Sequence, residues 1–199
     1  MRDVAVYLES GVAMASDDGT AAWVFDLDLW GRCGQGDTTD QALAALLASL
    51  PEPVTLTVAE RIHGDERAFE RDLLPASAEE IAVTAAILDR TRAQTIHLVC
   101  SLPREVLDAE VPARRLPRFA RWRTIRQIAW HIADTESRYY LPSLGLPSRP
   151  RAANLLGELE QSARHVSDTL AALPPDLVRR DGGTVWTSVK LLRRLAWHE

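Results

Sequence analysis

Residues 122–140 constrain the fold of this chain more than any other stretch. Their apolar side chains recur at steps of three and four residues, which predicts one amphipathic helix. His131 lies at the shoulder of that apolar stripe. Residues 186–199 have the same design and present His198 at the corresponding shoulder. Two helices of like design, each with a histidine late in its run, predict a site between them.

Two further amphipathic helices are expected beside these, over residues 78–102 and 154–173. Capping residues mark where the four helices begin: Ser77 with Glu80, Thr124, Asn154 and Thr187. Leu141-Pro142 should end the helix that carries His131. Loops containing proline or glycine separate the four segments. Residues 77–199 are therefore predicted to form an all-α antiparallel four-helix bundle.

Residues 1–60 predict a small α+β module. Strand-like stretches cover residues 4–8, 22–27 and 54–58, because β-branched and aromatic residues or alternating polarity dominate there. A glycine-rich loop at residues 31–36 leads to a helix over residues 42–50, with Thr38 and Gln41 as its capping box. Residues 61–76 are polar and charged and are expected to be a linker. The predicted order is thus the α+β module, the linker, and the helical bundle.

The composition and charge of the sequence argue against several classes of function. The net charge of −5 argues against nucleic acid or an anionic membrane as a partner. No run approaches the roughly 18 apolar residues of a membrane span. Cys33 and Cys100 form no CxxC pair, and the N-terminus has no apolar run of signal-peptide length, so a cytoplasmic protein is expected. Six arginines between Arg114 and Arg126 allow two interpretations, a solvated loop or an anion-binding lip over the site.

The helix around His131 resembles the second helix of the DinB-like (damage-inducible) four-helix-bundle family. The matching residues are His131-Ile-Ala-Asp-Thr-Glu136, and Trp197-His198-Glu199 resembles the start of the family's His-x-x-x-His pattern. The resemblance covers residues 77–199. It implies a divalent metal, Zn or Ni, with His131 and His198 as two of three histidine ligands. The third position falls four residues after His198, beyond the printed sequence.

Two carboxylates are candidate supplements to this pair. Asp134 lies one turn from His131, so it is the nearest substitute ligand. Glu136 falls near the centre of the apolar stripe, where a carboxylate is costly unless it is paired. It either orients an imidazole in the second shell or pairs with an arginine.

The remaining histidines and the tryptophans carry weaker predictions. His63, His97 and His165 have no second histidine at ligand spacing, so we expect them at the surface. The tryptophans that flank the histidine pair pack in the core or form a stacking wall for an aromatic substrate: Trp122, Trp130, Trp186 and Trp197.

The N-terminal stretch resembles the HicB-like module, in which a glycine-rich loop leads into a short helix. The residues that carry this resemblance are Gly31, Gly36, Asp37, Thr38, Ala42 and Leu43. HicB antitoxins usually carry a DNA-binding segment after the module, and the sequence has none that we recognise. The antitoxin function is therefore not carried over.

Two functions follow from these resemblances. One is a divalent-metal-dependent transferase or hydrolase that acts on a small molecule and uses a low-molecular-weight thiol, as some DinB-like enzymes do. The other is a non-catalytic binding or interaction protein that keeps the scaffold with an incomplete metal site. In that second case the small module is expected to mediate assembly into a homodimer.

Overall fold

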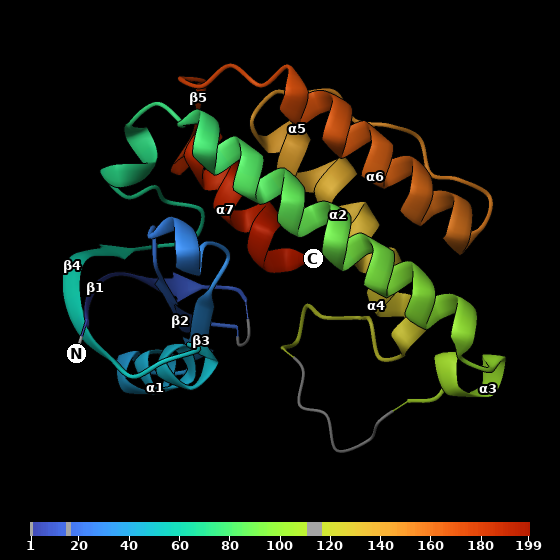
Figure 1. Cartoon of the computed structure of the whole chain (residues 1–199), viewed down its shortest axis with the longest axis horizontal. Helices are drawn as coiled ribbons and strands as arrows, with labels where there is room; N and C mark the ends of the chain where they lie inside the picture. The colour runs from blue at the N-terminus through green and yellow to red at the C-terminus, as the bar shows by residue number, and fades with distance from the viewer. Residues whose placement is uncertain (1, 15–16, 111–116) are drawn as a thin grey trace.

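The computed structural model describes residues 2–14, 17–110 and 117–199. Its N-terminal part is a four-stranded sheet with strand order β3-β2-β1-β4, in which β1 pairs with β2 antiparallel and with β4 parallel. Figure 1 shows the sheet with α1 beneath it and the helices of the C-terminal part above it. The elements of this part are β1 (Arg2–Val12), β2 (Gly19–Trp23), η1 (Leu27–Leu29), β3 (Cys33–Gly36), α1 (Thr39–Ser49) and β4 (Val54–His63).

Alternation along β1 explains how the sheet buries both faces. Val4, Val6 and Leu8 pack against Ala42 and Leu46 of α1. The next residues along the strand point the other way, where Tyr7 meets the rings of Phe25 and Phe69. Side chains at successive strand positions lie on opposite faces, so one face of the sheet contacts α1 and the other faces the C-terminal helices.

The C-terminal part is built around α2, which packs against both α6 and α7, while α4 packs against α6. Its apolar core includes Leu141, Leu170, Leu192 and Leu195. The N-terminal part ends with η2 (Arg71–Leu73). The elements of the C-terminal part are α2 (Ala78–Ser101), α3 (Arg104–Leu107), α4 (Ile125–Thr135), the π-helix η3 (Glu136–Tyr140), α5 (Leu141–Ser143), α6 (Leu155–Ala171), β5 (Val178–Asp181), β6 (Thr184–Thr187) and α7 (Ser188–His198).

The prediction of an all-α four-helix bundle after the module is wrong. Val178–Asp181 and Thr184–Thr187 pair as an antiparallel hairpin, which closes over Gly182 and Gly183. Valine and threonine favour strands, and Gly182 adopts the positive φ of a tight turn. The segment carrying His131 also continues through η3 and α5, since Pro142 occupies the first turn of α5, where a missing amide costs little. The result is six α-helices, η3 and a hairpin among the described residues of this part.

The segment predicted as a linker is packed. β4 extends to His63, and Phe69 and Asp72 are fully buried between the sheet and α7. Lys190 of α7 donates to the carbonyl oxygen of Arg67 at 2.7 Å. These contacts attach the two parts of the chain to each other.

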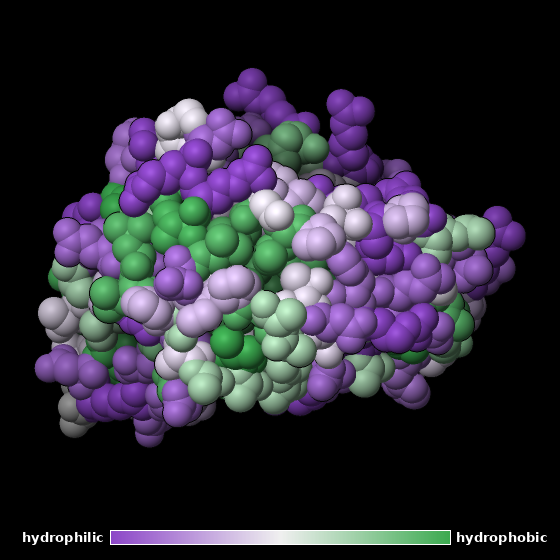
Figure 2. All heavy atoms as spheres, turned by 90° about the horizontal axis from the view of Figure 1, so that it is seen from above, coloured by the Kyte–Doolittle hydropathy of each residue, from purple (hydrophilic) through white to green (hydrophobic). Residues whose placement is uncertain are grey.

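The face seen in Figure 2 carries both hydrophilic and apolar side chains, unevenly distributed. Figure 2 shows apolar side chains gathered toward the end where η2 and the start of α2 lie in Figure 1. Leu73, Leu74 and Val178 are among the exposed apolar residues of the chain. None of the helices in the described ranges has the length and apolar character that a bilayer crossing requires.

Candidate functional site

The structure brings His131 of α4 and His198 of α7 together. Their Nε2 atoms lie 3.3 Å apart, and the ring centroids are 5.0 Å apart with the planes at 65°. The two histidines are 67 residues apart in sequence. Packing of α7 against η3, which continues α4, places them side by side.

Neighbouring side chains fix the His131 ring. Trp122 stacks on it with 3.5 Å between the ring centroids and 10° between the planes. On the ring's edge, Nδ1 lies 3.2 Å from the hydroxyl of Thr135, one turn along α4. The ring therefore has little freedom to turn, and Nε2 is held toward His198.

Burial favours the neutral form of both imidazoles. Burial lowers the pKa of His198 to about 3, assisted by His131, Arg194 and Arg92. Burial also lowers the pKa of His131, although Asp134 opposes that shift. The Nδ1 atom of His198 is buried and has no hydrogen-bond partner among the described residues. Neutral imidazole is the form that binds a metal ion.

The pair opens into a pocket of about 330 Å³ whose walls are largely aromatic. Five rings of the C-terminal part line it: Phe119, Trp122, Tyr139, Tyr140 and Trp197. The N-terminal part closes the pocket with Met14 and Glu66. The site is therefore shared between the two parts of the chain, which sequence reasoning did not anticipate.

Glu66 is one of three charged residues of this wall that sequence reasoning missed, together with Asp65 and Arg194. It adopts a left-handed backbone conformation, with φ 55°, and its carboxylate accepts a hydrogen bond from the Tyr139 hydroxyl at 2.9 Å. Lys190 lies 2.9 Å from the same carboxylate. Burial opposes its ionisation, but Arg194 and Lys190 outweigh burial and hold the pKa of Glu66 below its ordinary value. Nothing in the sequence distinguishes Glu66 from the other acidic residues around it.

Glu136 pairs with an arginine, which is one of its two predicted alternatives. Its carboxylate is fully buried and accepts from Arg92 Nη2 at 2.6 Å. Arg92 also donates to Glu199 through Nε and Nη2, both at 2.7 Å. Burial and the nearby Glu199 raise the pKa of Glu136 well above its ordinary value, and Arg92 only partly offsets this. No hydrogen bond joins Glu136 to either imidazole within the described ranges.

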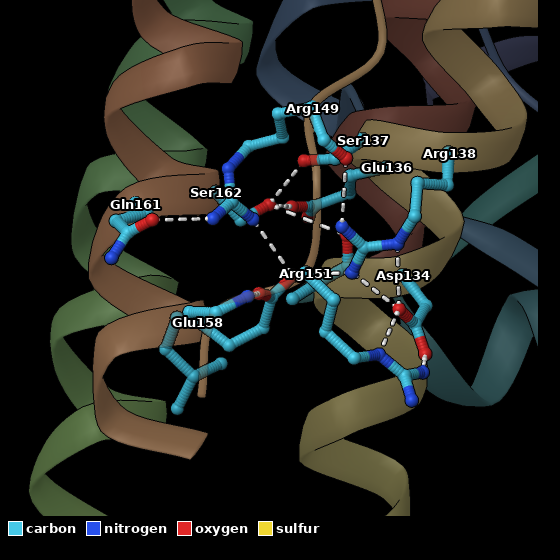
Figure 3. A network of polar contacts seen from close by, with 12 residues as sticks. Asp134, Glu136, Ser137, Arg138, Arg149, Arg151, Glu158, Gln161 and Ser162 are labelled. Carbon is cyan, nitrogen blue, oxygen red and sulfur yellow. Dashed lines mark hydrogen bonds and ion pairs between the residues drawn. The ribbon is translucent and has the colours of Figure 1, made fainter. Parts of the chain in front are cut away.

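Asp134 is held on the outer side of α4. Arg138 and Arg151 both donate to its carboxylate, as Figure 3 shows. It lines an open hollow together with Trp122 and His131. It therefore acts on His131 through its charge rather than through a hydrogen bond.

The remaining histidines lie away from this pair. His63 and His97 are exposed, and His165 contacts the carbonyl oxygen of Pro147 at 2.9 Å. Trp186 is buried in the core, whereas Trp130 lies under the guanidinium of Arg151. Arg114 and Arg115, two of the six arginines expected near the site, lie outside the described residues.

The geometry fits two corners of a metal site. Two imidazoles bound to one tetrahedral ion at about 2.0–2.1 Å have nitrogens roughly 3.3–3.4 Å apart. The observed 3.3 Å between the Nε2 atoms agrees with that separation. Across the described residues, however, no three His, Cys, Asp or Glu side chains are placed to hold an ion together. Among the described residues, the protein would thus supply two ligands to a metal ion.

Comparison with known proteins connects this geometry to a family. Residues 87–199, which include α4, α7 and most of α2, match the DinB superfamily. No curated protein and no solved structure matches the chain. Because the family match spans more than half of the sequence, the chain belongs to the DinB superfamily.

Proposed function

We propose that this protein is a metal-dependent transferase or hydrolase that acts on a small molecule, with a low-molecular-weight thiol as co-substrate. His131 and His198 would hold the metal, Zn or Ni. The separation of 3.3 Å between their Nε2 atoms is the observation that carries the proposal. The lowered pKa values of both imidazoles support it, since they disfavour the imidazolium form, whose second proton a metal would have to displace.

The chain's own residues suggest how the reaction is organised. A bound divalent ion would supply Lewis acidity. His131 and His198 leave its other positions to ligands from outside the chain. The aromatic walls exclude water from a small substrate, and the ionised Glu66 carboxylate offers an atom that can hold a proton.

A second candidate is a binding protein in which the histidine pair needs no metal. A separation of 3.3 Å also suits a weak hydrogen bond in which one neutral imidazole donates its N–H to the other. The lack of a third ligand among the described residues favours this reading. The homodimer expected for such a protein stays a prediction, which light scattering in the presence of a chelator would check.

We also propose that residues 1–60 form a HicB-like module. The order of strands and helix in this part supports it, with three strands, a helix and a final strand. We propose no DNA-binding role for the module.

Metal content distinguishes the two functional candidates. We expect purified protein to bind about one Zn or Ni ion per chain, measured by elemental analysis after dialysis. His131→Ala should lose the ion, whereas His97→Ala should retain it, because His97 is exposed on α2. Cobalt(II) loaded in place of the native ion should show visible bands that change when a thiol is added. Protein that stays metal-free after loading, with its fold intact, would favour the binding protein.

A further inference from the structure

A second, open hollow adjoins the aromatic pocket and shares two lining residues with it. It has a volume of about 450 Å³, and both hollows are lined by Trp122 and His131. Arg121, Trp130 and Arg151 also line the open hollow. A molecule bound there would contact a wall that contains both His131 and two guanidinium groups.

Arg151 is held in position with one of its edges free. Its Nε and Nη2 atoms bind the carboxylate of Asp134, and its guanidinium lies 4.8 Å from the centre of the Trp130 ring. Nη1 has no hydrogen-bond partner among the described residues. A guanidinium can bind a second oxyanion through its remaining edge, so Arg151 is both ordered and able to take a ligand.

The charge around the hollow is positive. In the network of Figure 3, three arginines share two carboxylates: Arg138, Arg149 and Arg151 with Asp134 and Glu158. Arg121 adds a further positive charge and forms no ion pair within the described part of the chain. Asp134 is the one acidic residue that lines the hollow, and two guanidinium groups already occupy its oxygens.

We propose that this hollow binds the oxyanion of a small molecule, a carboxylate or a phosphate, between Arg121 and Arg151. The planar faces of Trp122 and Trp130 hold the apolar body beside that group, and the rest of the molecule reaches His131. The inference rests on the proposed function for the part that His131 plays. The binding itself needs only the arginines and the tryptophans.

The test uses aromatic probes that differ in one group. Binding of 2-naphthoate, 2-naphthyl phosphate and the uncharged 2-naphthamide is measured by calorimetry, on the protein as purified and again with a chelator. We expect either anion to bind at least about tenfold more tightly than the amide, as charge-assisted hydrogen bonds imply. The tighter of the two anions identifies the oxyanion that the hollow prefers.

Substitutions distinguish binding by positioned guanidinium groups from binding by the overall positive charge. Arg121→Gln and Arg151→Lys should each weaken anion binding about tenfold, because lysine keeps the charge but lacks the second edge of a guanidinium. The matched control is Arg123→Gln, an exposed arginine that does not line the hollow. Equal binding of the amide and the anions, or an equal loss in Arg123→Gln, would overturn the inference. Anion binding should persist in the presence of the chelator. Its loss there would show that the anion binds a metal rather than the arginines and would overturn the inference, whereas the metal proposal is tested separately by metal content.

Discussion

Lys190 is the only lysine in the sequence, and the fold buries it completely. Its ammonium group has three partners: the Glu66 carboxylate at 2.9 Å and the carbonyl oxygens of Arg67 and Val185 at 2.7 and 3.0 Å. It also lies 4.7 Å from the centre of the Trp186 ring. A buried ammonium group is tolerated only when its donors are satisfied. Here the satisfied donors join the wall of the aromatic pocket to α7.

The side chain of Lys190 should titrate near neutral pH. Burial lowers its pKa to about 8, with Arg194 and Arg193 adding to the shift and Glu66 and Glu9 opposing it. Between pH 8 and about 10.5 the unfolded chain binds more protons at this residue than the folded chain does, so its contribution to the free energy of unfolding rises with pH. Because the chain has one lysine, selective isotope labelling gives one Cε signal whose shift reports the pKa directly. A midpoint near 10.5 would contradict the prediction, and Lys190→Met should remove the pH dependence.

Arg92 is another buried cation, in the C-terminal part of the chain. It donates four hydrogen bonds, to Glu136, Glu199 and the carbonyl oxygen of Leu159. Arg92→Met should lower the free energy of unfolding by about 3–5 kcal/mol, because it leaves buried carboxylates without a counterion. Chemical denaturation measures the change. Arg90→Ala is the matched control on the exposed face of α2 and should change stability by less than about 0.5 kcal/mol. Adding Glu136→Gln to Arg92→Met should restore part of the loss, and no recovery would show that packing dominates.

At the scale of elements, β3 depends on one glycine. A Cβ atom at Gly34 would lie 2.1 Å from the carbonyl oxygen of Ala42 and 2.3 Å from the amide nitrogen of Leu46. These are backbone atoms of α1, so the contact cannot be relieved by a rotamer change. Gly34→Ala should therefore destabilise the protein by about 1–3 kcal/mol or more, by forcing α1 off the sheet. Gly183→Ala is the control, since its nearest neighbour would be a side-chain atom of Arg67 at 3.5 Å. Equal melting temperatures of the two variants would contradict this account.

The same glycine explains which elements the sequence could predict. Ser77 forms the expected capping box with Glu80, and Thr124 caps its helix as expected, because a cap depends on residues within one turn. β3 has the composition of a loop, and only the approach of α1 accounts for its glycines. The sequence does not predict the hairpin β5–β6, because each strand has only four residues. Local chemistry was predictable, whereas pairing between distant segments was not.

The same difference between local and long-range features decides which residues of the site could be predicted. The periodicity of two helices was enough to predict that His131 and His198 face a common site, and the structure places them 3.3 Å apart. Glu66 and Met14 reach the pocket only because the sheet packs on α7, and no local pattern marks either of them. A wall supplied by another part of the chain leaves no periodic signal in the sequence.

For the whole molecule, α7 is the bridge between the two parts. Three successive cations on this helix pair with three acids from the first 72 residues: Lys190 with Glu66, Arg193 with Asp72, and Arg194 with Glu9. All three cations are buried. Arg193 and Arg194 also lie over the Trp23 ring of the sheet, at 4.5 and 4.9 Å from its centre. Separating the parts would leave these six charges unpaired or force them back into water.

The interface therefore predicts that the two parts unfold together. The calorimetric enthalpy of unfolding should equal the van't Hoff enthalpy, and urea denaturation should show one transition. Arg193→Met should lower stability by about 3–5 kcal/mol, since it leaves Asp72 buried without its guanidinium partner, and Arg193→Met with Asp72→Leu should recover part of that loss. Asp176→Asn, at an exposed site, serves as the control. Two separate transitions in the wild-type protein would mean that α7 does not couple the parts, and the Glu66 wall of the pocket would then have to form independently of the sheet.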